Sequence, residues 1–124
     1  MKYASVILLS LIWAAPSFAH GPGEKGPNGG LMEDVAGIDA ELVTSGNKVT
    51  INVFDSKDTK PVPTKGYSGA VLITNGTAKE TVSLAASGEN SLEGEAKTAI
   101  APGATVTLTI KTAEGKSGQA KYKK

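Results

Sequence analysis

The sequence predicts an all-β fold, an antiparallel β-sandwich of about seven strands. Apolar and polar residues alternate with period two over most of the chain after residue 30, which is the pattern of strands with one buried face. Glycine, proline and asparagine recur between these segments at short spacing, and no segment after Ala19 has the period of a helix. Outer faces of threonine, lysine, glutamate and serine are typical of two sheets packed on each other.

The first strands form a clear hairpin. Residues 38–43 and 48–54 both alternate, and the Ser-Gly-Asn sequence at 45–47 supplies the turn between them. Before this hairpin, Leu31 and Met32 either form a short first strand or pin the preceding arm to the domain.

A second hairpin follows in the middle of the chain. Residues 55–63 form a polar connection, because Pro61 and Pro63 have no N–H group to donate to a central strand. The apolar run at 70–73 predicts a strand buried on both faces, and the Asn-Gly pair at 75–76 is a strong turn signal.

Four further segments complete the predicted sheets. Residues 79–84 are the return strand of the second hairpin, and residues 91–96 form a short strand after a Ser-Gly-Glu-Asn turn. Residues 104–111 give the cleanest alternation in the chain, with alanine, valine, leucine and isoleucine on one face. A Glu-Gly-Lys turn then leads into a last strand at 117–122.

The first 19 residues have the features of a secretory signal peptide. Lys2 precedes an apolar run at 6–15, and Ser17 and Ala19 are the small residues that signal peptidase requires. The run is well short of the roughly 20 residues that span a bilayer. We therefore expect an exported, periplasmic protein that does not span the membrane after cleavage.

The domain organisation follows from this boundary. We divide the chain into a signal peptide at 1–19, a flexible Gly/Pro arm at 20–30 and a single β-sandwich domain at 31–124, and we expect a monomer.

Composition argues against several classes of function. The chain has no cysteine, which excludes disulfides and thiolate sites. Its 13 basic residues are all lysine, against 12 acids, so we expect no nucleic-acid partner. Nucleophile-elbow, phosphate-loop and metalloprotease motifs are missing from the sequence, and we expect no enzymatic activity.

One residue carries a specific chemical hypothesis. Cleavage after Ala19 would make His20, the only histidine, the first residue of the exported chain. Its amine and Nδ1 atom could then chelate Cu(II) or another divalent transition metal. Glu24, Glu33 and Asp34 are the nearby residues that could add an oxygen ligand. The competing interpretation is that His20 is merely the residue beside a cleavage site.

The start of the predicted domain also resembles a known group of proteins. The sequence Gly-Pro-Asn-Gly-Gly at 26–30, the step Leu-Met-Glu-Asp at 31–34 and the following hairpin are similar to small periplasmic immunoglobulin-like domains. Such domains occur alone or at the front of adaptor subunits of heavy-metal efflux pumps. The Asp-x-x-x-x-Lys-Pro-Val sequence at 55–62 resembles their hairpin connection. The resemblance implies an immunoglobulin-like sandwich, a link to metal efflux and a periplasmic efflux or envelope protein as partner.

Two functions remain open from the sequence. The first is a periplasmic binding or accessory module linked to the handling or efflux of a transition metal. The alternative is a structural or protein-interaction β-sandwich module without a metal site, which adds an edge strand to its partner.

Overall fold

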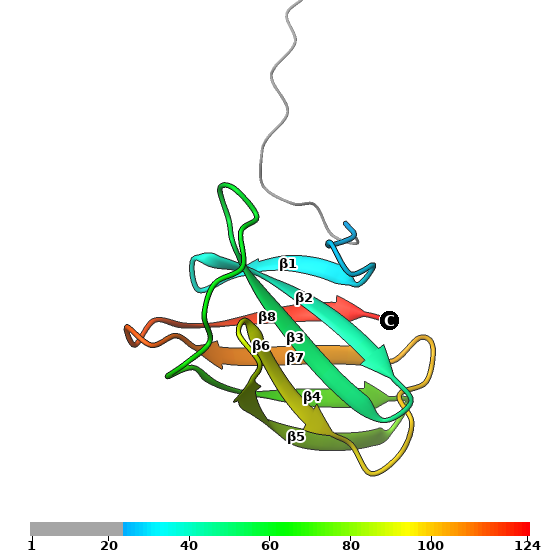
Figure 1. Ribbon diagram of the computed structural model, residues 1–124. Helices are drawn as coiled ribbons and strands as arrows, with labels where there is room; N and C mark the ends of the chain where they lie inside the picture. The colour runs from blue at the N-terminus through cyan, green and yellow to red at the C-terminus, as the bar shows by residue number, and fades with distance from the viewer. Residues whose placement is uncertain (1–23) are drawn as a thin grey trace, which may run out of the picture.

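The computed structural model describes residues 24–124, which contain eight β-strands and no helix (Figure 1). All hydrogen-bonded neighbours are antiparallel, and the strands follow the order β1-β2-β3-β6-β5-β4-β7-β8 in one nearly closed sheet. The prediction of an all-β, antiparallel fold is confirmed. The strands are β1 (Leu31–Val35), β2 (Ile38–Ser45), β3 (Lys48–Asp55), β4 (Ser68–Asn75), β5 (Ala78–Ser87), β6 (Ser91–Glu95), β7 (Thr105–Lys111) and β8 (Ser117–Lys123).

Strand β5 carries the sheet around a corner. Its residues 78–84 pair with β4, whereas residues 85–87 pair with β6. Figure 1 shows the result, with β2 and β3 crossing in front of β8, β7 and β4. A single, nearly closed sheet thus folds over, in a barrel-like or sandwich arrangement, so that its two layers meet at their inner faces. In the described residues, 24–124, no helix is long and apolar enough to cross a membrane.

The two end strands, β1 and β8, close the structure by lying beside each other. A Cβ atom on Gly118 of β8 would lie 3.1 Å from both the backbone nitrogen of Ala36 and the side chain of Val35, so the approach is tight. The Tyr122 hydroxyl donates a hydrogen bond of 2.9 Å to the Ala40 carbonyl oxygen on β2. The Tyr122 side chain therefore joins β8 to β2, the strand next to β1.

The structure has one strand more than the seven that the sequence predicts, and this additional strand is β1. Residues 31–35 pair along their whole length with β2. The turn that joins them has positive φ at both central residues, 52° at Ala36 and 85° at Gly37, as in a type I′ turn. Alanine is an unusual residue at the first of these positions, which is why the turn is weakly marked in the sequence.

The prediction that residues 70–73 are buried on both faces is wrong. Val71 and Ile73 point into the core, with exposed fractions of 1% and 8%, but Leu72 is 37% exposed. Among residues 24–124, nothing forms a second layer over the outer face of β4, so only alternate residues are covered.

The second hairpin turns one residue later than its Asn-Gly pair suggests. Asn75 pairs with Ala78, so Gly76 and Thr77 are the two central residues of the turn. Of these, only Gly76 has a positive φ, 65°, which matches a type II′ turn with glycine first.

The core lies between the two layers and is built from the inward-facing aliphatic residues of both. Gly94 on β6 allows the tightest contact near the corner, because a Cβ atom there would meet the Ser83 carbonyl oxygen at 2.5 Å and a Val82 methyl at 2.8 Å. Fully buried core residues include Val49, Ile51, Val53, Val71, Leu92, Val106, Leu108 and Ile110.

Substituting Gly94 tests this corner. Gly94→Ala should lower the free energy of unfolding by about 1–3 kcal/mol, since the new methyl group must displace backbone as well as side chains. Denaturant unfolding measures the effect. Glu95→Ala, at the exposed next position, is the control and should change stability by less than about 0.5 kcal/mol.

Tyr122 gives a prediction about pH. Burial raises the pKa of its phenol well above the usual value of about 10, and the Glu33 and Asp39 carboxylates raise it further. Because the unfolded chain loses this proton first, the free energy of unfolding should fall as the pH rises above about 10. Tyr122→Phe should lack this component of the pH dependence and be less stable by about 1 kcal/mol at neutral pH. Identical profiles for the two proteins would contradict the assignment.

Candidate functional site

The described end of the N-terminal arm folds back onto β1. Lys25 pairs with Leu31, and the Met32 N–H donates to the Glu24 carbonyl oxygen at 2.8 Å. The Gly26 N–H donates to the Gly30 carbonyl oxygen at 2.7 Å, which closes the turn. The arm residues from 24 onward are therefore held by hydrogen bonds.

A buried carboxylate holds this turn. Glu41 on β2 has no exposed surface. Its Oε2 atom accepts hydrogen bonds from the Asn28 N–H at 2.7 Å and the Gly30 N–H at 2.8 Å, and its Oε1 atom accepts one from Asn28 Nδ2 at 2.8 Å. Asn52 Nδ2 on β3 lies 3.4 Å from the same Oε1 atom. The Glu41 carboxylate thus accepts the backbone hydrogen bonds that a neighbouring strand would accept in a sheet.

The glycines of the Gly-Pro-Asn-Gly-Gly sequence make this contact possible. A Cβ atom on Gly26 would lie 2.7 Å from the Glu41 carboxyl carbon. A Cβ atom on Gly30 would overlap the Leu42 carbonyl oxygen. Both glycines are therefore needed because the turn packs directly on β2.

Sequence reasoning missed the role of Glu41. Glu41 and Asp39 alternate with Ala40 and Leu42 along β2, which suggests a solvent-facing pair, yet both acids have exposed fractions of 0%. The signal that could have found Glu41 is the turn itself, since the N–H groups of residues 28 and 30 require a nearby acceptor.

The predicted oxygen ligands lie in different environments. Glu24 is exposed and sits beside Met32. Glu33 is half-buried and Asp34 is exposed, and as consecutive residues of a strand they point to opposite faces. The structure therefore does not bring Glu33 and Asp34 together. His20 lies outside the described residues.

Asp34 lies directly opposite Asp39 in the pairing of β1 with β2. Glu33 instead acts on the buried phenol of Tyr122, whose pKa it raises after burial itself. Within residues 24–124, no three histidine, cysteine or acidic side chains come together in a way that could hold a metal ion.

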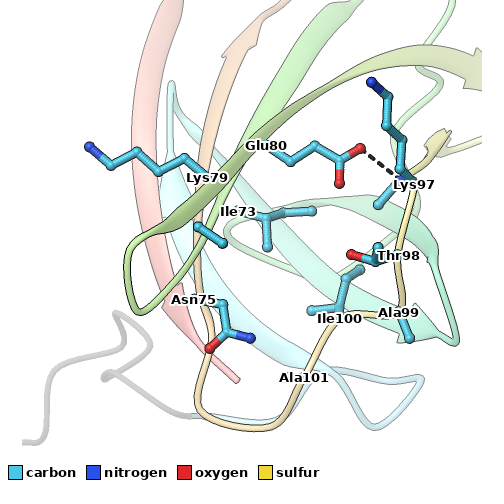
Figure 2. Close-up of a pocket in the computed structure, with 11 residues that line it drawn as sticks. Ile73, Asn75, Lys79, Glu80, Lys97, Thr98, Ala99, Ile100 and Ala101 are labelled. Carbon is cyan, nitrogen blue, oxygen red and sulfur yellow. Dashed lines mark hydrogen bonds between the residues drawn. The ribbon is translucent and has the colours of Figure 1, made fainter.

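A pocket of about 320 Å³ lies between the β4–β5 hairpin and residues 96–101 (Figure 2). Ile73 and Ile100 line it with apolar surface. Glu80 Oε2 accepts a hydrogen bond of 2.7 Å from the Lys97 N–H, so this carboxylate ties the 96–101 segment to β5. Figure 2 shows the Lys79 and Lys97 side chains extending away from the pocket, whereas the Glu80 carboxylate points toward the 96–101 segment.

Glu41→Gln tests the attachment of the arm. The amide has one oxygen acceptor where the carboxylate has two, and its N–H₂ group would face N–H donors. The hydrogen bonds from the backbone N–H groups of Asn28 and Gly30 should therefore weaken. Hydrogen bonds to a charged group contribute about 1.5–3 kcal/mol each, and we expect a loss of about 2–4 kcal/mol in the free energy of unfolding. Hydrogen exchange of the Asn28 and Gly30 amides should also accelerate.

Glu95→Gln on the exposed part of β6 is the matched control for this change in charge. It should leave both the stability and the exchange of those amides unchanged. Unaltered exchange at Gly30 in the Glu41→Gln protein would show that the carboxylate does not hold the turn.

Comparisons with known proteins give no match to this chain among family models, curated proteins or solved structures. Its function is therefore inferred from its own residues, above all from the anchored turn and the arm that leads into it.

Proposed function

We propose that this chain is an exported, periplasmic binding module for a divalent transition metal, with Cu(II) the best fit, and that the metal is held at an amino terminus beginning with His20. The amine and the Nδ1 atom of an N-terminal histidine form a six-membered chelate, and imidazole nitrogen suits copper. Pro22 lacks an N–H group and would end further coordination by backbone amides.

The observation that carries this proposal is the anchoring of the arm by Glu41. Because the turn at 26–30 is tied to β2, Glu24 has a defined position beside β1. Four residues of chain extend by at most about 14 Å, so the separation of His20 from Glu24 is limited to that reach. A metal bound by His20 would thus be kept near Glu24 and the acidic residues of β1, Glu33 and Asp34.

Exposure favours two of the three carboxylates as the additional ligand. Glu24 and Asp34 are open to solvent, so a metal ion could reach a carboxylate oxygen of either. Glu33 is half-buried, which makes it the weakest of the three candidates.

The finer description of the fold belongs to the same proposal. Two antiparallel layers joined at a corner are compatible with an immunoglobulin-like sandwich, in keeping with the resemblance of residues 26–34 to small periplasmic domains. We propose that the protein is a non-catalytic accessory module and that its partner is a periplasmic efflux or envelope protein.

The alternative, a protein-interaction module that lends an edge strand, requires an open sheet edge. In the described residues, β1 and β8 lie together, and Lys25 pairs with Leu31 at one end of β1. A partner strand would have to enter between β1 and β8 or displace the arm from β1, which is why the metal-binding function comes first.

Copper titration of the exported protein tests the proposal. N-terminal sequencing should first show that the chain begins at His20. A variant with one extra residue ahead of His20 keeps every side chain but removes the chelating amine, and its Cu(II) affinity should fall by roughly 100-fold. Equal affinities for the two proteins would rule out the site.

Two carboxylate variants locate the additional ligand. Glu24→Gln and Asp34→Asn should weaken Cu(II) binding by about tenfold or less if either residue contributes an oxygen. Glu95→Gln, with the same loss of charge on another part of the surface, should have no effect.

A further inference from the structure

The outer face of β8, β7, β4 and β5 carries positive charge and no carboxylate. Residues along these strands alternate between buried and more exposed, so every second side chain points outward. The outward positions include Lys79, Lys111, Lys121 and Lys123, and most of the others are threonine or serine. We call this surface the lysine–threonine face.

The charge of this face differs from that of the whole molecule. The chain has nearly equal numbers of basic and acidic residues, 13 and 12. The lysine–threonine face has four lysines and no acid, so the acidic residues lie on other parts of the molecule. Many of them lie on the other layer, as with Asp34, Asp39 and Glu41 on β1 and β2. A chain with a formal net charge of only +1 thus presents a cationic side, which attracts an anionic partner.

The strand register fixes how these side chains are arranged. Lys123 and Thr105 are opposite each other, as are Thr74 and Lys79, and Thr105 pairs with Thr74. One row across the sheet therefore has a lysine at each end and two threonines between them. Figure 1 shows β8, β7 and β4 side by side in this layer.

The next row contains the exposed leucine. Lys121 pairs with Thr107, and Thr107 pairs with Leu72. Among residues 24–124, Leu72 is the large apolar side chain with substantial exposure, 37%. It projects from the central part of a cationic, hydroxyl-rich surface.

The geometry points to the surface of an anionic phospholipid bilayer as the partner of this face. Lysine side chains are attracted to phosphate headgroups, threonine hydroxyls can donate hydrogen bonds to phosphate oxygens, and Leu72 can reach the apolar boundary beneath them. A single-stranded nucleic acid fits less well, because the outward positions hold no aromatic residue on which bases could stack.

Vesicle co-sedimentation of the exported protein tests this proposal. Binding to vesicles of phosphatidylglycerol and phosphatidylcholine should exceed binding to phosphatidylcholine alone, and it should weaken as salt shortens the Debye length from about 10 Å at 0.1 M. A lysine near an anionic surface contributes about a fivefold gain in binding. We expect a fourfold variant that combines Lys79→Gln, Lys111→Gln, Lys121→Gln and Lys123→Gln to bind on the order of 100-fold more weakly.

A matched variant separates position from net charge. A second fourfold variant removes the same charge at exposed positions on other surfaces and combines Lys57→Gln, Lys60→Gln, Lys65→Gln and Lys97→Gln. It should bind the anionic vesicles within about twofold of the unchanged chain. Leu72→Ser keeps all the lysines and should weaken binding several-fold. Circular dichroism confirms that each variant is folded.

Three outcomes would overturn the proposal. The first is equal loss of binding in the two fourfold variants, which would indicate attraction by overall charge. The second is equal sedimentation with neutral and anionic vesicles. The third is binding of a single-stranded 20-mer DNA without binding to anionic vesicles, which would assign the face to nucleic acid. None of these measurements involves a metal, so they are independent of the function proposed for His20.

Discussion

The buried carboxylate of Glu41 determines how the chain enters its fold. A charged group without exposed surface requires hydrogen bonds to its oxygens, and the N–H groups of Asn28 and Gly30 supply them at 2.7 and 2.8 Å. The dependence is mutual, because those N–H groups have no strand partner of their own. The turn, the glycines that let it pack and the position of Glu24 all follow from this one acceptor on β2.

Fastening by side chains also closes the sheet. Tyr122 reaches from β8 to the backbone of β2, and Gly118 allows β8 to pack against the end of β1. The same principle operates at the corner, where Gly94 lets β6 pack against β5. Ladder hydrogen bonds build the two layers, but single residues decide how the layers are brought together.

Much of the strand pattern could be predicted from the sequence, because alternation reports burial on one face. The strands from β2 to β8 match the predicted segments to within a few residues. Whether residues 31–35 form a strand could not be decided from the sequence, because the turn that follows at Ala36 and Gly37 has a weak sequence signal. Leu72 was assigned to the interior because a run of apolar residues does not reveal whether one or both faces of a strand are covered.

The candidate site was less predictable, for a different reason. Burial of Glu41 on the outer side of β2 depends on a loop packing over that strand, and a local pattern holds no information about such packing. The opposite directions of Glu33 and Asp34 follow directly from strand alternation once β1 is known to be a strand.

The division of β5 between two partners has a consequence for folding. Residues 78–84 join a local hairpin with β4, but 85–87 belong to the ladder with β6, and Val71 on β4 must also find Leu108 on β7. Pairing residues so far apart in sequence requires closing a long loop, which slows folding relative to local contacts. Because β5 is a member of both layers, neither layer can be completed alone. The polypeptide should thus unfold in one cooperative transition, even though it looks like two sheets.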